Sequence, residues 1–361
     1  MRVSTEDVVS SQDLGSKDLP PIVPVDRSLK AALRARVDGK AKPPGSLGRI
    51  EELAVRLGLM CGRLDPQMQC VVLLVFAGDH GLTEEGVSRY PAAVTATMVA
   101  TFLSGRASIN AFAAATGVDI RIVDAGVAID LPPHPNLTDA KIRHGTRNAA
   151  REPALTPEEV GDALARGRDI AAAAITAGAD AIAIGEMGIG NTAAAALIAH
   201  RLAPAPLDDC VGAGAGQDEA GMARKRAAIA RAAARSGATA PRDVLAEFGG
   251  CEIAMMAGAV LGAAALRRPV LVDGFIASAA ALAAIRLAPA AHDYCVFAHR
   301  SAERGHARLL QALDATPLLD LDMRLGEGTG AVLAAPLLRA AARLLTDVAD
   351  LSEVVPTAPP P

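Results

Sequence analysis

The stretch MRLGEGTGAVLAA (residues 323–335) places a single acidic side chain, Glu327, between two glycines. Its neighbours are mostly apolar, so we expect the carboxylate to be desolvated, which raises the pKa of an acid. A carboxylate of this kind is suited to act as a general base near neutral pH. The glycines would let backbone and carboxylate both touch a small ligand. The structural alternative is a glycine-rich bend before a buried helix, with Glu327 in the first turn, where the helix dipole favours it.

Two other glycine-rich stretches have the residue types of a phosphate site. In GEMGIGN (residues 185–191) a strand leads through a turn into a helix that begins at Asn191, and amides at a helix N-terminus bind anions. In VGAGAGQ (residues 211–217) the loop precedes a helix that carries Lys225, which adds a positive charge. Neither stretch has the spacing of a dinucleotide fingerprint or a Walker A loop. A tight capped turn and a flexible loop before a basic helix face are the structural alternatives.

Three polar residues elsewhere have the types found in catalytic sites. Asp79 and His80 follow an apolar run and invite a metal interpretation, but the other histidines lack HxH or HExxH spacing. We therefore expect no metal, and we expect Asp79 and His80 to belong to a structural loop ordered by backbone hydrogen bonds. Ser301, in HRSAERGH (residues 299–306), lacks a G-x-S-x-G elbow, so helix capping and ligand hydrogen bonding are the roles predicted for it.

These residues share one structural context, the end of an apolar run. Five such runs are separated by alanine-rich helical segments, which predicts a Rossmann-like α/β fold with an open parallel sheet and crossover helices. The runs lie within residues 70–81, 118–127, 180–191, 269–278 and 294–303. The polar residues at their ends are Asp79, His80, Asp124, Glu186, Asp273, His299 and Ser301. Because ligands bind at the carboxyl ends of strands in such sheets, we expect one site along this rim.

Composition along the chain predicts four segments. Residues 1–25 are expected to form a flexible N-terminal extension and residues 26–69 a helical part of a small subdomain. Residues 70–335 are expected to form the α/β catalytic domain. Residues 336–361 are expected to add a C-terminal helix to the small subdomain, followed by a proline-rich tail.

Bulk composition argues against several functions. A net charge of −4 and 2% aromatic residues are not typical of a nucleic-acid-binding protein. The apolar helical runs are shorter than a bilayer span and no secretory signal is recognised, so we expect no membrane span and a cytoplasmic location. The five cysteines form no CxxC pair and are expected to be reduced.

Six groups of motifs, in order from about Lys42 to Leu345, resemble those of the nicotinate-nucleotide:dimethylbenzimidazole phosphoribosyltransferases. They are KPPGSLGRIEELA, FAGDHG with EEGVSRYP, GEMGIGNTAAAALI, FGGCEIAMMAGAVLGAA with VLVDGFIASAAAL, HRSAERGH and PLLDLDMRLGEGTGAVLA. The resemblance implies transfer of the phosphoribosyl group of nicotinate mononucleotide to 5,6-dimethylbenzimidazole, giving α-ribazole 5′-phosphate and nicotinate in cobalamin lower-ligand synthesis. It also implies a Rossmann-like sheet with a smaller helical part, a homodimer, and no cofactor or metal.

The resemblance also implies roles for particular residues. Glu327 would be the general base, with Glu186 as electrostatic support. The nucleotide site would comprise Gly188, Gly190, Asn191, Gly214, Gly216, Lys225 and Ser301. The pocket for the accepting base would comprise Ser88, Tyr90, Met187 and Leu325, and the glycines around Glu327 would leave room for a flat aromatic ring. The alternative is a non-catalytic module that binds the nucleotide or a benzimidazole.

Four positions depart from the family pattern. Ala215 stands where Thr is more common, Ala92 where Gln is usual, and Arg300 and Arg304 where Gln and Pro are often found. Both carboxylates are retained, so we expect these changes to affect base preference and ligand contacts without abolishing activity.

Overall fold

The computed structural model describes residues 21–214 and 216–354. Most of the predicted N-terminal extension (residues 1–20), the departure at Ala215 and the tail from residue 355 therefore lie outside the described residues. The described end of the extension is held by hydrogen bonds. The Tyr294 hydroxyl donates to the Val23 carbonyl (2.8 Å), and the Val25 N–H donates to the Asp293 carboxylate (3.1 Å).

A parallel sheet forms the centre of the described chain, in the order β3-β2-β1-β4-β5-β6. The strands are β1 (Val71–Gly78), β2 (Asp119–Gly126), β3 (Leu137–Asp139), β4 (Ala181–Met187), β5 (Val270–Val272) and β6 (Cys295–Phe297). The chain moves outward from β1 to β3, then returns to β4 beside β1 and moves outward the other way. The carboxyl ends of β1 and β4 therefore flank a topological switch point. The predicted Rossmann-like sheet is confirmed, and each of the five predicted runs contains one of its strands.

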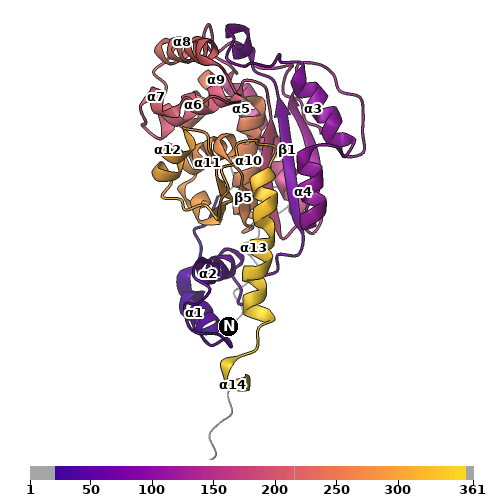
Figure 1. Cartoon of the computed structure of the whole chain (residues 1–361), viewed down its shortest axis with the longest axis vertical. Helices are drawn as coiled ribbons and strands as arrows, with labels where there is room; N and C mark the ends of the chain where they lie inside the picture. The colour runs from indigo at the N-terminus through magenta and orange to yellow at the C-terminus, as the bar shows by residue number, and fades with distance from the viewer. Residues whose placement is uncertain (1–20, 215, 355–361) are drawn as a thin grey trace, which may run out of the picture.

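Helices cover both faces of this sheet (Figure 1). One face carries α3 (Val94–Leu103), α4 (Ser108–Thr116) and the first half of α13 (Thr329–Thr346). The other carries α5 (Pro157–Thr176), α10 (Cys251–Ala265) and α11 (Phe275–Leu287). The remaining elements beside the sheet are η4 (Gly81–Glu85), α6 (Asn191–Leu202), α7 (Leu207–Cys210), α8 (Glu219–Arg235), α9 (Pro241–Phe248), η5 (Pro289–Tyr294), β7 (His299–Arg300), α12 (His306–Ala312) and β8 (Leu319–Asp320).

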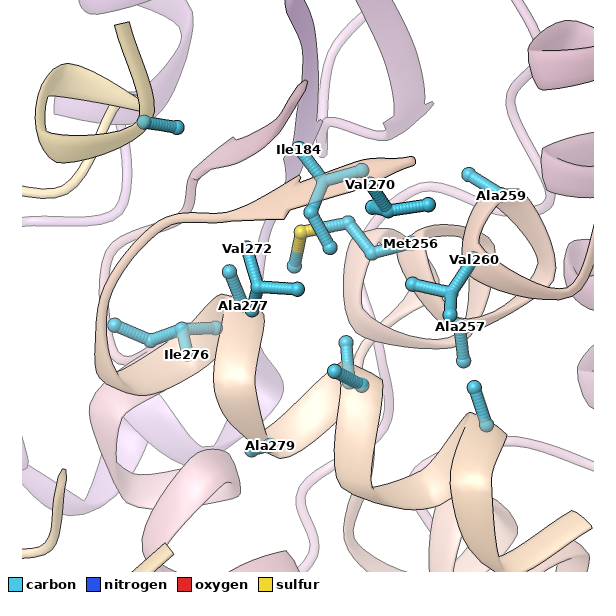
Figure 2. Close-up of a cluster of buried hydrophobic side chains, with 14 of the residues drawn as sticks. Ile184, Met256, Ala257, Ala259, Val260, Val270, Val272, Ile276, Ala277 and Ala279 are labelled. Atoms are coloured by element: carbon cyan, nitrogen blue, oxygen red, sulfur yellow. The ribbon is translucent and has the colours of Figure 1, made fainter. Parts of the chain in front are cut away.

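The core between the sheet and the α10–α11 layer is made of branched and small side chains. Figure 2 shows Ile184 of β4 and Val272 of β5 meeting Met256 of α10, with Ile276 of α11 nearby. These side chains are all buried. Small residues let the helices approach closely: a Cβ atom at Gly258 of α10 would overlap the backbone of α5. The alanine- and glycine-rich composition is thus explained by close packing in the interior.

A small helical part lies at one end of the molecule (Figure 1). It contains η3 (Arg27–Leu29), α1 (Lys30–Asp38) and α2 (Arg49–Cys61), with the second half of α13 and α14 (Leu351–Val354). The predicted boundary between residues 335 and 336 falls inside α13, which continues through Pro336. One helix therefore belongs to both parts. By length and composition α13 could cross a membrane, but 61% of the stretch is buried inside the protein, as in a core helix.

Candidate active site

A cavity of about 560 Å³ lies at the carboxyl ends of the strands. It brings together most of the predicted site residues, namely Ser88, Tyr90, Glu186, Met187, Gly188, Gly190, Asn191, Gly214, Lys225, Ser301, Leu325 and Glu327. Gly216, Asp79 and His80 do not line it. Its wall also includes Asp273 and His299, which the sequence places on the same rim, and three polar residues without a predicted role, Thr192, Glu303 and Arg324.

Glu327 lies in a turn where three successive residues have left-handed backbone conformations, with φ of 85° at Gly326, 63° at Glu327 and 85° at Gly328. Positive φ is uncommon for a residue other than glycine, and such strain concentrates at functional sites. A Cβ atom at Gly326 would lie 2.5 Å from Glu186 Oε1, and one at Gly328 would lie 2.5 Å from a Leu73 methyl. The glycines therefore permit this backbone and its close packing, and Gly326 also lines the cavity, where room for an aromatic ring stays a prediction.

The start of α13 fixes this turn against the sheet. The helix begins at Thr329 with Gly328 as its N-cap, so Glu327 precedes the helix and the first-turn alternative is wrong. Asp273, directly after β5, accepts hydrogen bonds from the N–H groups of Gly328 (3.2 Å) and Ala331 (2.9 Å). These amides are among those that a helix N-terminus leaves without partners. Asp273 thus holds the turn that carries Glu327.

The Glu327 carboxylate is buried and incompletely hydrogen-bonded. Glu327 is 6% exposed, and its Oε2 atom has no hydrogen-bond partner among the described residues. Burial raises the pKa of Glu327, the backbone amide of Ile109 at the start of α4 partly opposes this rise, and the Asp273 charge adds to it. A desolvated carboxylate with free accepting capacity is well placed to take a proton.

Glu186 lies beside Glu327 near the end of β4, and the Glu327 N–H donates to its carbonyl (3.2 Å). Its carboxylate accepts a hydrogen bond from the Asn191 side-chain amide. Burial raises the pKa of Glu186 to about 8; the Asn191 hydrogen bond opposes the rise, and the charges of Glu252, Asp273 and Glu327 add to it. A pKa of about 8 favours the protonated form of Glu186 at neutral pH.

The opposite end of the cavity carries a buried cation. Lys225 of α8 is 1% exposed, and its Nζ donates to Thr192 Oγ1 (2.8 Å) and to the Gly212 carbonyl (2.9 Å). Burial lowers the pKa of Lys225 to about 8, although the Glu303 charge acts in the opposite direction. The N-terminus of α6 lies next to it, with Gly190 as N-cap. A lysine beside a helix N-terminus is suited to bind phosphate.

Glycines shape the turn before α6. Gly190 has a φ of 93°, and a Cβ atom there would lie 2.7 Å from the Thr83 methyl. A Cβ atom at Gly188 would lie 2.5 Å from the Gly78 carbonyl. The turn is therefore packed closely against the end of β1 and the segment that follows it.

The wall near the cavity mouth is mostly apolar. Met187 and Leu325 contribute aliphatic surface, and Ser88 Oγ accepts a hydrogen bond from the Tyr90 N–H (3.1 Å). Tyr90 and Leu325 are 47% and 55% exposed, so they form the rim of the opening. A flat, uncharged ligand fits such a wall better than a charged one.

Known proteins are similar to this chain over nearly its whole length. A family model described as "Phosphoribosyltransferase" matches residues 22–355. A relative from Cupriavidus taiwanensis, named nicotinate-nucleotide–dimethylbenzimidazole phosphoribosyltransferase, is 53% identical over 92% of this chain and 96% of its own. A relative of the same name from Chloroflexus aurantiacus is 47% identical over 94% of this chain and 98% of its own. The chain belongs to the nicotinate-nucleotide–dimethylbenzimidazole phosphoribosyltransferase family. The crystal structure of CobT from Thermus thermophilus, at 47% identity, matches with a TM-score of 0.87 over 90% of this chain and 98% of its own.

Three family-motif residues lie outside the cavity wall. Asp79 accepts a hydrogen bond from the Ala128 N–H (2.8 Å), and its carbonyl accepts one from Thr146 N–H (2.9 Å). His80 Nε2 is 2.6 Å from Glu252 Oε1. Gly216 lies in the loop after Gly214 without lining the cavity. No group of three or more potential metal ligands occurs within residues 21–214 and 216–354.

The HRSAERGH motif of the family is organised around His306. Its Nδ1 accepts a hydrogen bond from the Ser301 N–H (2.8 Å), so the ring proton is on Nε2, which donates to Ser278 Oγ (3.0 Å). Burial lowers the pKa of His306 to about 3, and it is therefore neutral. Ser301 does not cap α12, which begins at His306 with Gly305 as N-cap, so that prediction is wrong. Ser301 faces the cavity instead.

Proposed function

We propose that this chain transfers the phosphoribosyl group of nicotinate mononucleotide to 5,6-dimethylbenzimidazole, giving α-ribazole 5′-phosphate and nicotinate in cobalamin lower-ligand synthesis. The observation that carries the proposal is the Glu327 carboxylate, which is buried, has a raised pKa and lacks a partner for one oxygen among the described residues. It shares one cavity with Lys225 and the N-terminus of α6. Family membership supplies the substrates.

The reaction requires one general base and no general acid. One benzimidazole nitrogen attacks C1′ of the ribose while the bond from C1′ to the pyridinium nitrogen breaks, and its electron pair stays with nicotinate. The other benzimidazole nitrogen loses its proton to Glu327, which acts as the general base. The pyridinium leaves without protonation, so no general acid is required. Attack from the opposite face inverts the anomeric carbon from β to α.

Glu186 is proposed to stabilise the positive charge that develops on the ribose. An ionised carboxylate in a site that excludes water is an effective stabiliser of a cationic transition state. Burial raises the pKa of Glu186 to about 8, which favours its protonated form at neutral pH before the nucleotide binds. The cationic pyridinium of the bound nucleotide favours loss of that proton, so the carboxylate becomes charged when the substrate is in place.

The phosphate is proposed to bind at the other end of the cavity. Lys225 would supply a cation and Thr192 an amide from the first turn of α6, where Asn191 also lies, with Gly188, Gly190 and Gly214 giving close backbone approach. Ser301 would contact the nucleotide. Gly216 does not line the cavity, so its proposed contribution is limited to the conformation of the loop that carries Gly214. Ser88, Tyr90, Met187 and Leu325 would enclose the accepting base.

We also propose that the protein is a homodimer in the cytoplasm, with a catalytic domain around the sheet and a smaller helical subdomain. Tyr90, Leu321 and Leu325 are exposed apolar side chains, two of them at the cavity mouth, and a second copy would cover them. All five cysteines are free, as is usual in a reducing compartment. Light scattering on the purified protein would test the oligomeric state.

The function is tested by incubating the purified chain with nicotinate mononucleotide and 5,6-dimethylbenzimidazole and measuring nicotinate by chromatography. We expect release of nicotinate that depends on both substrates. If calorimetry shows that both ligands bind and no nicotinate or ribazole phosphate forms with any azole base, the chain is a binding module instead.

A further inference from the structure

Two polar side chains of the cavity wall, Glu303 and His299, each keep a buried atom unpaired. The atoms are Glu303 Oε2 and His299 Nδ1, and neither has a hydrogen-bond partner among the described residues. Glu327 Oε2 is in the same situation and is assigned the azole proton, whereas these two atoms have no role in the proposed transfer. A buried polar atom without a partner costs free energy, and in a binding cavity a ligand can supply the missing hydrogen bond.

Both residues belong to the short segment that begins with β7. Burial alternates along it: His299, Ser301 and Glu303 are buried, and the residues between them are exposed. Such alternation is typical of a strand with one buried side, and β7 covers the first two residues. The three buried side chains all line the cavity, so one side of this segment forms part of its wall.

The segment is fixed in place by contacts outside the cavity. The Ala302 N–H donates to the Met323 carbonyl (2.9 Å), which ties the segment to the chain that leads to Glu327. A Cβ atom at Gly330, in the first turn of α13, would overlap the His299 ring. The side chains are therefore held by close packing, as is required of groups that must be in position before a ligand arrives.

The two residues lie toward different ends of the cavity. A Cβ atom at Gly212 would overlap Glu303 Oε2, and the Gly212 carbonyl accepts a hydrogen bond from Lys225 (2.9 Å), so Glu303 is near the lysine end. His299 Nε2 is 3.6 Å from Asp273 Oδ1. Because Asp273 holds the turn that carries the general base, His299 is near the other end.

A ribose has the chemistry and the position to pair with both atoms. The phosphate of the nucleotide is on C5′ and the reaction takes place at C1′, so the sugar spans the wall between the two ends. A hydroxyl both donates and accepts, so it can bond a carboxyl oxygen, and it can bond the Nδ1 atom in either tautomer of the imidazole. Because C2′ adjoins C1′ and C3′ lies toward C5′, the 2′-hydroxyl falls near His299 and the 3′-hydroxyl near Glu303.

We propose that Glu303 and His299 form a subsite for the ribose diol that selects ribonucleotides, with the 3′-hydroxyl on Glu303 and the 2′-hydroxyl on His299. This inference rests on the proposed function, because it assumes that nicotinate mononucleotide is the ligand. The two residues hold the sugar so that C1′ faces the accepting base. A nucleotide that lacks one hydroxyl leaves a buried polar atom unpaired, and sites of this kind reject such analogues strongly.

The first test compares substrates on the unmodified protein. We measure kcat/KM by nicotinate release with 5,6-dimethylbenzimidazole and with nicotinate mononucleotide or its 2′-deoxy or 3′-deoxy analogue. Each analogue should be used at least roughly 100-fold less efficiently than the natural nucleotide. Loss of the electron-withdrawing 2′-hydroxyl makes a positive charge at C1′ easier to form, so a lower rate with that analogue reports the lost contact. A smaller penalty for either analogue would overturn the inference.

The second test assigns each hydroxyl to its residue. Glu303→Leu removes the hydrogen-bonding group and should reduce the penalty for the 3′-deoxy analogue to less than about tenfold, while the 2′-deoxy penalty stays. Glu303→Gln keeps a hydrogen-bonding group and should retain most of both penalties. His299→Leu should relax only the 2′-deoxy penalty. Ala302→Ser, at an exposed position of the same segment, is the matched control and should change neither.

A purely structural role of the two residues predicts a different pattern. It would lower kcat/KM for all three nucleotides by the same factor and leave both penalties unchanged, and that result, or relaxation of the wrong penalty, would overturn the inference. If a leucine variant does not fold, as seen by circular dichroism, the substrate comparison on the unmodified protein still decides. Failure of the proposed function would be seen separately, as no nicotinate from nicotinate mononucleotide itself.

Discussion

At one end of the cavity a buried carboxylate oxygen lacks a hydrogen-bond partner among the described residues, and at the other end a buried ammonium group has two hydrogen-bond acceptors. The unpaired oxygen belongs to Glu327, and the pKa of Glu186 beside it is raised to about 8, which favours its protonated form at neutral pH. Lys225, in contrast, donates to Thr192 and to the Gly212 carbonyl. Both ends are buried, so solvent exposure does not account for the difference.

The contrast separates two tasks. A group that must gain or lose a proton during a reaction benefits from a shifted pKa and from spare hydrogen-bonding capacity. A group that must hold a ligand benefits from being fixed in place before the ligand arrives. The carboxylate end is therefore expected to control kcat, and the lysine end is expected to control the KM for the nucleotide.

The largest effect is expected for Glu327→Gln. Loss of the general base should reduce kcat by roughly 10²- to 10⁴-fold, while calorimetry should show that nicotinate mononucleotide still binds with an affinity close to that of the unmodified protein. Glu353→Gln, in the exposed helix α14, is the matched control and should leave both quantities unchanged. An unchanged kcat in Glu327→Gln would show that Glu327 is not the general base.

Lys225→Met should have the opposite signature. Methionine fills the buried site but loses the charge, so the KM for nicotinate mononucleotide should rise roughly 10- to 100-fold, as for a lost charge-assisted hydrogen bond. The kcat and the KM for dimethylbenzimidazole should change far less. Lys30→Met, on the exposed side of α1, is the control. A large fall in kcat with an unchanged nucleotide KM would contradict the division between the two ends.

The two ends should also affect the pH dependence of kcat/KM on opposite sides of its maximum. The pKa of Glu186 is raised to about 8 and that of Lys225 is lowered to about 8. Below this pH, kcat/KM should fall about tenfold per unit as the carboxylate cluster takes up a proton, and above it the loss of the lysine charge should weaken phosphate binding. Steady-state rates across this range test the bell shape. In Glu186→Gln the acid limb should move to lower pH, and an unmoved limb would assign it to another group.

Much of the carboxylate end could be predicted from sequence because strand ends are easy to recognise. Apolar runs followed by Glu186 and Asp273 predicted a shared rim, and the parallel sheet places them there. The strand β3 could not be predicted, because Leu137–Asp139 is too short to form an apolar run. The continuity of α13 through Pro336 could not be predicted, because a proline inside a helix removes a backbone hydrogen bond and usually marks a helix boundary.

The conformation of the key acid could not be predicted. The left-handed backbone at Glu327 is held by groups distant in sequence. The Glu186 carbonyl accepts a hydrogen bond from the Glu327 N–H, and the Asp273 carboxylate accepts one from the Gly328 N–H. No local pattern reports such contacts. The burial of Lys225 could not be predicted from the sequence either. Its helix has a basic, exposed face, and only the tertiary structure shows that this lysine is buried. That the two ends belong to one site could be recognised only once the order of the strands in the sheet was known.

The smallest effect is expected at the link between the two ends. Arg324, three residues before Glu327, donates from Nη1 to the Gly214 carbonyl (3.0 Å), so it joins the acid-bearing loop to the lysine end. A hydrogen bond from a charged donor at a largely exposed position contributes about 1 kcal/mol, which corresponds to roughly a fivefold change. Arg324→Ala should therefore raise the nucleotide KM about fivefold with kcat little changed, whereas Arg343→Ala near the end of α13 should change neither. If kcat fell with Arg324→Ala as it does with Glu327→Gln, the two ends would not be separable, and the link itself would have to position the general base.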